Sequence, residues 1–100
     1  MIKIIKVRGG SMRPTLVPGD YMIIIKARAL RPGFVVLVDH PEYGVIVKRV
    51  VSVSGATLRL VGDGHVTTET VDMGDVAVSQ VMGRVRWAVK PGWFKRPESL

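Results

Sequence analysis

Ser11 and Lys48 are the two residues of this 100-residue sequence whose types and settings best suit covalent chemistry. Ser11 follows Gly9 and Gly10, and two glycines let the backbone turn sharply and expose a hydroxyl beside backbone N–H groups. Arg13 precedes a proline, which favours an extended conformation, so no regular helix is expected directly after Ser11. A Gly-Gly-Ser turn alone is weak evidence, because most such turns are ordinary loops.

Lys48 lies in an apolar run, residues 45–51, that is typical of a β-strand. On a strand Lys48 shares its face with Ile46 and Val50, and Arg49 occupies the other face, which is also apolar. One of the two cations should therefore be desolvated, and desolvation lowers the pKa of a lysine. A neutral amine can accept the proton of a serine hydroxyl. The alternative is an edge strand on which both side chains bury their aliphatic parts and place their charged groups in solvent.

Other nucleophile arrangements fit the sequence poorly. Pro14 stands three residues after Ser11, which excludes a Ser-x-x-Lys motif, and Arg13 excludes a Gly-x-Ser-x-Gly turn. A serine triad could recruit His40 or His65, but His40 lies in a turn-like segment and His65 in a Gly-flanked loop, so both are expected at the surface. With two histidines and no cysteine, we expect no metal site and no cofactor.

Composition indicates one globular domain, residues 1–100, with a core at about 2–89 and a tail at 90–100. The chain is 47% hydrophobic, and its net charge of +7 suits anionic partners, although a solvated basic surface explains it equally well. Its longest apolar runs have five residues, against roughly 20 for a membrane-spanning helix. We therefore expect a soluble protein, cytoplasmic or peripheral to a membrane.

The tail mixes aromatic residues with cations. Trp93 and Phe94 stand beside Lys95, a composition suited to a membrane interface, so peripheral membrane contact is one prediction. The alternative, slightly favoured, is a Trp87 that packs in the core followed by a frayed terminus.

Pro-Gly pairs at residues 18–19, 32–33 and 91–92 separate short Val- and Ile-rich runs, and these pairs predict type II turns. Strands are predicted at residues 2–8, 21–26, 34–38, 45–54, 57–61 and 81–89, with a hairpin turn at 54–57. In the last strand Val81, Gly83, Val85, Trp87 and Val89 should share one face, as in a half-buried strand. The predicted fold class is all-β: a coiled or barrel-like, mostly antiparallel arrangement.

Four segments in order resemble the motif boxes of type I signal peptidases. They are Gly10-Ser11-Met12-x-Pro14-Thr15-Leu16, Pro18-Gly19-Asp20, Val47-Lys48-Arg49-Val50 and Gly62-Asp63-Gly64. The similarity extends over about residues 7–85. The short spacing from serine to lysine is more similar to compact relatives, namely LexA-type autoproteases and the maturation proteases of nickel superoxide dismutase.

The resemblance implies a fold of the LexA C-terminal or signal peptidase catalytic core type. It also implies that Ser11 attacks a scissile carbonyl in an extended protein or peptide substrate, with Lys48 as general base. The Ser11 N–H would be an oxyanion donor, and Thr67 would orient the lysine amine. The residues matched as motif support are Gly10, Met12, Pro14, Gly19, Asp20, Arg49, Gly62 and Asp63.

The sequence also departs from these relatives. Gly9 stands where they often carry a second hydroxyl, Glu69 replaces an aspartate, and Val71 replaces an arginine. Only ten residues precede Ser11, so we expect a soluble member or a chain from which an anchor was removed. Two alternatives to an active signal-peptide or propeptide protease stay open. One is a catalytically impaired relative that binds peptides, and the other is a basic nucleic-acid-binding β-barrel, which leaves the four motifs unexplained.

Overall fold

The structure, a computed structural model, describes residues 2–9, 12–63 and 75–90, together with the backbone of residues 93–95. Its elements in chain order are β1 (Ile2–Lys6), β2 (Tyr21–Ile25), β3 (Val35–His40), β4 (Gly44–Ser54), β5 (Thr57–Val61), β6 (Asp75–Ala77), the 3-10 helix η2 (Val78–Gln80), β7 (Val81–Lys90) and β8 (Trp93–Lys95). The described part of the chain contains no α-helix. The prediction of an all-β fold is confirmed.

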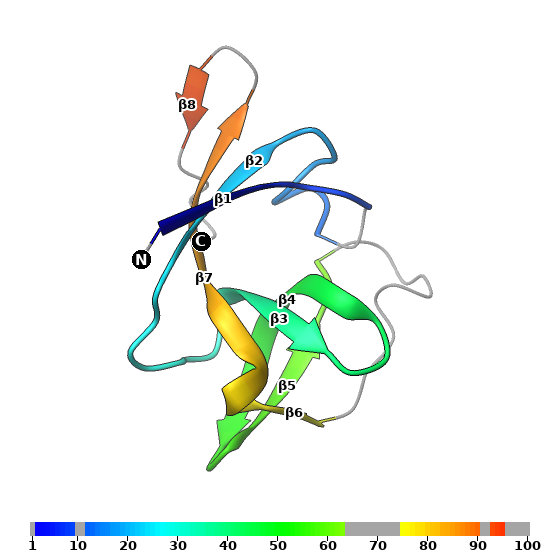
Figure 1. The fold of residues 1–100 in the computed structure, drawn as a ribbon, viewed down its shortest axis with the longest axis vertical. Coiled ribbons are helices and arrows are strands. Elements are labelled where there is room, and N and C mark those ends of the chain that lie inside the picture. Colours follow the sequence, from blue (N-terminus) through cyan, green and yellow to red (C-terminus); the bar gives the residue numbers. More distant parts are fainter. Residues whose placement is uncertain (1, 10–11, 64–74, 91–92, 96–100) are drawn as a thin grey trace.

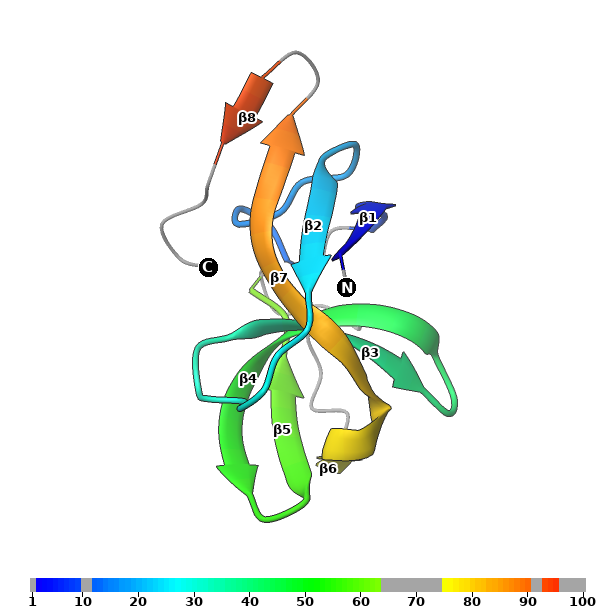
Figure 2. The same cartoon turned by 60° about the vertical axis from the view of Figure 1, so that its left-hand side comes forward.

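All strands join one antiparallel sheet in the order β1-β2-β7-β3-β4-β5-β6, with β8 paired to β7. In Figure 1, β1, β2 and β8 lie in the upper half and β3 to β6 in the lower half, and β7 runs through both. Figure 2 shows how strongly β7 curves between them. The sheet coils but is not closed, because the described strands include no pairing between β1 and β6.

The six predicted strands are all present, and their ends differ from the prediction by at most two residues. Two of the predicted turns are also confirmed. Gly19 has a φ of +100° and Gly33 a φ of +93°, as the third position of a type II turn requires. The turns are closed by hydrogen bonds from Asp20 N–H to the Val17 carbonyl at 3.0 Å and from Phe34 N–H to the Arg31 carbonyl at 3.1 Å. The pair at 91–92 lies outside the described residues.

The strict alternation predicted for β7 is wrong, because the pairing register of β7 shifts twice. The shifts occur opposite Leu37/Val38 of β3 and opposite Ile23/Ile24 of β2. Each shift inserts an extra residue and reverses which face the following side chains occupy. As a result Val85 and Ala88, three residues apart, are both buried in one cluster.

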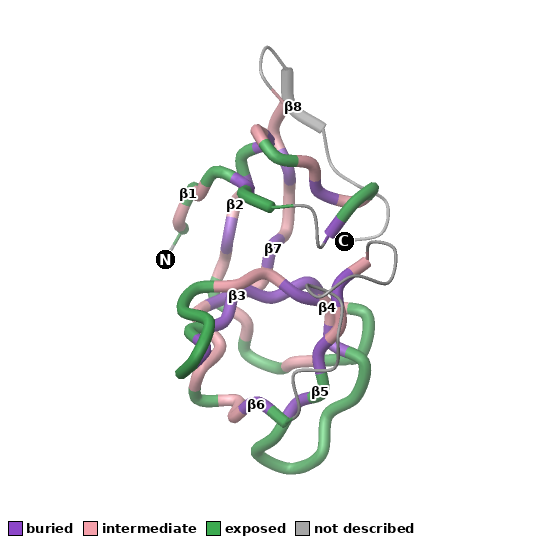
Figure 3. The backbone as a smooth tube through the Cα atoms, turned by 90° about the vertical axis from the view of Figure 1, so that its right-hand side faces the viewer, coloured by how far each residue is buried: buried purple, intermediate pink, exposed green. Residues whose placement is uncertain are grey.

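Two hydrophobic clusters lie on the two sides of β3, whose Val35–Val38 stretch is fully buried (Figure 3). The upper cluster consists of Val7, Met12, Leu16, Met22, Ile24, Val35, Leu37, Val85 and Ala88. The lower cluster consists of Val36, Val38, Val50, Leu58, Leu60 and Val76. Met12 and Leu16 come from the motif that contains Ser11, so this motif is anchored by apolar burial in the upper cluster.

The described part of the tail is paired with the sheet, and residues 96–100 lie outside the described residues. Residues Trp93–Lys95 form β8, which pairs with β7 in the register Val89↔Phe94. Trp87 is half-buried, with the Arg86 guanidinium 5.1 Å from its ring centre. The side chains of Trp93 and Phe94 lie outside the described residues, so contact with a membrane stays a prediction. Over the described residues, no helix has the length and apolar character needed to cross a bilayer.

Candidate functional site

The segment from Val7 to Asp20 is a loop whose two ends are tied together. Val7 N–H donates to the Asp20 carbonyl at 2.7 Å, and Gly19 N–H donates to the Val7 carbonyl at 3.2 Å. Within the loop, Leu16 N–H donates to the Met12 carbonyl at 2.9 Å, and both side chains are buried. We call residues 7–20 the nucleophile loop because they include Ser11, the predicted nucleophile. Gly10 and Ser11 themselves lie outside the described residues.

The Asp20 side chain is buried at the base of this loop. Its Oδ2 accepts a hydrogen bond from Val17 N–H at 3.2 Å, which braces the Pro18-Gly19 turn. The Lys90 ammonium, from the end of β7, lies 3.1 Å from Oδ1 and 3.3 Å from Oδ2. Asp20, predicted as motif support, thus stabilises the loop base and joins it to β7.

Lys48 is buried in the middle of β4, with an exposed fraction of 3%. It pairs in register with Val36 of β3, and it shares its face with Ile46 and Val50, as predicted. The alternative in which both cations reach solvent is wrong for Lys48. Burial penalises the ammonium form of a lysine, which is the condition that a lysine base needs.

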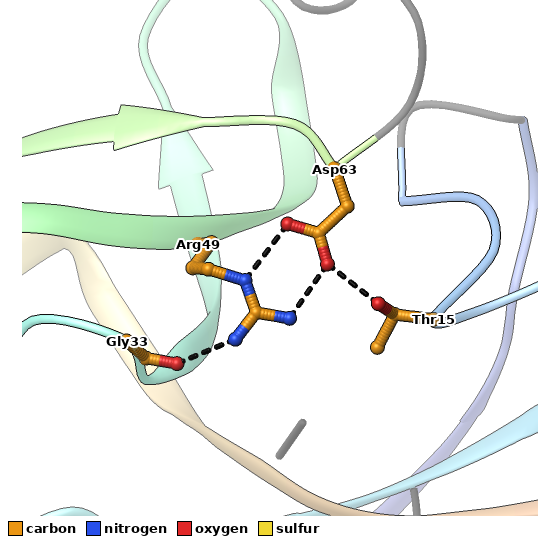
Figure 4. A network of polar contacts seen from close by, with 4 residues as sticks. All are labelled: Thr15, Gly33, Arg49 and Asp63. Carbon is orange, nitrogen blue, oxygen red and sulfur yellow. Dashed lines mark hydrogen bonds and ion pairs between the residues drawn. The ribbon is translucent and has the colours of Figure 1, made fainter. Parts of the chain in front are cut away.

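Arg49, on the other face of β4, forms a network with Asp63 and Thr15 (Figure 4). Its guanidinium donates two parallel hydrogen bonds to the Asp63 carboxylate, Nε to Oδ1 at 2.8 Å and Nη2 to Oδ2 at 2.6 Å. Its Nη1 donates to the Gly33 carbonyl at 2.7 Å. The Thr15 hydroxyl donates to Asp63 Oδ2 at 2.6 Å. The carboxylate of Asp63 therefore joins the nucleophile loop to β4.

The electrostatics of this network favour its ionised form. Burial by itself raises the pKa of Asp63, but the hydrogen bonds from Arg49 and Thr15 and the charge of Arg49 outweigh it, so the pKa lies below its usual value. For Arg49, the hydrogen bond to Asp63 raises the pKa more than burial lowers it. A bidentate pair of this kind is among the stronger polar contacts in proteins.

The network brings together three of the four sequence motifs: those that contain Ser11, Lys48 and Gly62-Asp63. Sequence reasoning assigned Arg49 and Asp63 to the motifs without predicting that they pair with each other. It gave no role to Thr15, whose presence in the Ser11 motif was the available signal. Thr67, Glu69 and Val71 lie outside the described residues, so the orienting role assigned to Thr67 stays a prediction.

Gly9 has a φ of +73°, in the left-handed region that side chains rarely adopt. A Cβ at this position would meet no atom within 4 Å, so the constraint comes from the backbone and not from crowding. This gives a physical reason for the missing hydroxyl, because a serine here would be strained. A second oxyanion donor, if the site has one, has to come from another residue.

The prediction that His40 is a surface residue is wrong. Its exposed fraction is 8%, and its Nδ1 accepts hydrogen bonds from the N–H groups of Glu42 at 3.0 Å and Tyr43 at 3.3 Å. Its ring also contacts Tyr43, with centroids 4.8 Å apart. His40 thus holds the turn between β3 and β4. His65 lies outside the described residues, over which no three His, Asp or Glu side chains gather as metal ligands do.

Comparison with known proteins identifies a family. The model of the family described as signal peptidase, peptidase S26, matches residues 1–91. No curated protein and no solved structure matches the chain. The matched region contains all four motif segments and both ion pairs that hold the nucleophile loop. This chain therefore belongs to the signal peptidase family, peptidase S26.

Proposed function

We propose that this member of a peptidase family is a serine endopeptidase in which Ser11 is the nucleophile and Lys48 the general base. Its substrate would be a signal peptide or a short N-terminal propeptide of another protein, bound in extended form. The observation that carries the proposal is the Arg49–Asp63–Thr15 network. It ties the residue next to Lys48 to a residue four positions after Ser11, so it supports a shared site for the two.

In this mechanism a neutral Lys48 amine takes the proton of the Ser11 hydroxyl as its oxygen attacks the scissile carbonyl. The negative charge that develops on the carbonyl oxygen is stabilised by the Ser11 N–H. The lysine then gives its proton to the departing amine, which leaves an acyl-enzyme. Water, deprotonated by the same amine, attacks the ester and releases the acid product together with a free Ser11.

The remaining roles follow from the same scheme. Thr67 would hold the lysine amine in place by a hydrogen bond, as the family resemblance implies. Gly9 contributes no hydroxyl, and the loss of one oxyanion donor costs about 10²–10³ in rate, so we expect slow turnover. Slow turnover would still allow processing of one site in one substrate.

The face on which Lys48 lies sets a strict geometric requirement. Its strand neighbours Ile46 and Val50 pack with the lower cluster, whereas Met12 and Leu16 of the nucleophile loop belong to the upper one. The proposed mechanism requires the Lys48 amine and the Ser11 oxygen to come within about 2.6–3.2 Å of each other. If Ser11 and Lys48 act together as nucleophile and base, removing either side chain should stop cleavage, so substitution of each residue tests the proposal.

We expect Ser11→Ala and Lys48→Met each to abolish cleavage of a peptide with small residues at the scissile bond. Methionine keeps an apolar stem at the buried position, so the fold should survive. Exposed Ser79 and Lys26 supply the matched controls Ser79→Ala and Lys26→Met, which should cleave normally. Turnover is followed by mass spectrometry of the products, and folding by the thermal midpoint. Normal turnover by either active-site variant would contradict the proposal.

A catalytically impaired, peptide-binding relative is the second candidate, and the backbone at Gly9 favours it, because one donor is missing. It predicts peptide binding without cleavage and no covalent labelling by a serine-reactive acylating probe. Labelling of the wild type that is lost in Ser11→Ala would exclude it. Binding to a single-stranded oligonucleotide that weakens steeply with salt would instead favour the nucleic-acid alternative.

A further inference from the structure

We infer that Lys90 is a positioning residue for the peptidase reaction, which acts on the nucleophile loop through Asp20. This rests on the proposed function, because the loop matters to catalysis only if Ser11 is the nucleophile. Lys90 is the last residue of β7, far from Ser11 in sequence, and belongs to none of the four motifs.

Asp20 is the point where the two ends of the nucleophile loop meet. Its carbonyl accepts Val7 N–H at 2.7 Å, and its carboxylate accepts Val17 N–H at 3.2 Å. The carbonyl and the carboxylate of Asp20 therefore bind the two ends of the segment that contains Ser11. A shift of the Asp20 side chain would therefore displace the Val17 amide and the Pro18-Gly19 turn at the end of the loop.

Lys90 holds this carboxylate from outside the loop. Its ammonium lies 3.1 and 3.3 Å from the two Asp20 oxygens. The exposed side-chain fraction is 40% for Lys90 but only 6% for Asp20. Because the buried carboxylate has already lost most of its hydration, it gains from a nearby cation. Because the ammonium is partly in water, dissolved salt can screen the pair.

The position of Lys90 also connects the loop to the hairpin that follows. The neighbouring residue Val89 pairs with Tyr21 of β2, directly after Asp20, and with Phe94 of β8. The ion pair thus joins the end of the sheet where β2, β7 and β8 meet to the loop that includes Ser11. We expect the pair to contribute to the position of the nucleophile, and, because Asp20 is buried, also to stability.

The test uses Lys90→Met, Lys90→Arg and the exposed-lysine control Lys26→Met, with an uncharged peptide substrate. We expect Lys90→Met to lower kcat about fivefold with KM unchanged, the size of effect that one partly exposed ion pair supplies. Arginine should restore most of the rate. Raising the salt concentration should lower kcat of the wild type and of Lys26→Met, but not of Lys90→Met. An unchanged kcat in Lys90→Met, or an equal salt dependence in all variants, would overturn the inference.

A second measurement separates this inference from the proposed function. Hydrogen exchange at the Val17 amide should be faster in Lys90→Met than in the wild type, whether or not the protein cleaves the peptide, because this amide donates to Asp20. If the wild type never cleaves the peptide but the exchange rates still differ, the peptidase proposal is wrong and the coupling of Lys90 to the loop remains supported. Equal exchange in both proteins overturns the coupling itself.

Discussion

The nucleophile loop is held at two places by ion pairs of very different construction. At Thr15 it is bound to the Arg49–Asp63 pair, which makes two parallel hydrogen bonds of 2.6 and 2.8 Å and whose side chains are 19% and 14% exposed. At Asp20 it is bound to Lys90, whose ammonium contacts two oxygens at 3.1 and 3.3 Å and whose side chain is 40% exposed. One anchor is bidentate and mostly shielded from water, and the other is partly solvated.

The difference indicates that the Arg49 anchor and the Lys90 anchor have different roles. A planar guanidinium fixes a carboxylate in orientation as well as in distance, whereas an ammonium acts as a point charge on a flexible stem. The Arg49 anchor also binds the Gly33 carbonyl and lies on the strand that carries Lys48, so it supports fold and site together. The Lys90 anchor adjusts one end of the loop. Both carboxylates are largely buried, so removing either cation should lower stability as well as activity. Removing Arg49 should cost more stability, because it also breaks the hydrogen bond to the Gly33 carbonyl.

The largest effect is expected from Arg49→Met. The substitution leaves the partly buried Asp63 carboxylate with the hydrogen bond from Thr15 and removes the Nη1 bond to the Gly33 carbonyl. We expect the free energy of unfolding to fall by about 2–3 kcal/mol, because a desolvated charge loses its partner. For a chain of this size the thermal midpoint should drop on the order of 10 °C.

The control is Arg31→Met, which removes an exposed arginine from the turn next to Gly33 and should change the midpoint little. Calorimetry of both variants and of Lys90→Met tests the comparison. If Lys90→Met destabilised the protein as much as Arg49→Met, the two anchors would be equivalent in stability.

Acid should weaken the Arg49 anchor in a defined pH window. The pKa of Asp63 is lower in the folded protein than its usual value of about 3.9. Its carboxylate therefore adds stability that is complete above the unfolded-state pKa and is lost as pH falls through the folded-state pKa. The excess stability of the wild type over Asp63→Asn, from urea unfolding, should be constant from pH 7 to about 5 and shrink below about pH 4. A difference that grows on acidification would contradict this assignment.

Much of the fold could be predicted because its signals are local. The Val- and Ile-rich runs gave the six longer strands, and the Pro-Gly pairs at Gly19 and Gly33 gave type II turns, since both depend on neighbouring residues alone. The two apolar strand faces predicted that one of the cations at positions 48 and 49 would be desolvated, but not which one; Lys48 is the one that is buried. The three-residue strands β6 and β8 were missed because so short a run has no period, and the shifts in β7 were missed because they arise from its partners β2 and β3.

The polar contacts of the site were harder to predict. The resemblance to known motifs marked Arg49, Asp63 and Asp20 as relevant, but which cation meets which carboxylate depends on how distant segments fold together. Asp20 pairs with a lysine 70 positions away, outside every motif. The burial of His40 was missed for a related reason, because a turn-like sequence does not reveal that the imidazole will bind the turn's own N–H groups.

The smallest effect, and the sharpest test of the comparison, is expected from Thr15→Val. Valine has nearly the shape of threonine and removes only the hydroxyl, so the Arg49–Asp63 pair stays intact while its link to the nucleophile loop is lost. The free energy of unfolding should fall by about 1.5 kcal/mol, the lower end of what a hydrogen bond to a charged group contributes. In the double variant with Arg49→Met, the cost of removing the hydroxyl should differ from its cost in the wild type, because both groups act on one carboxylate. Strictly additive costs would mean that Asp63 does not couple the loop to β4. The comparison between the two anchors would then reduce to a difference in burial alone.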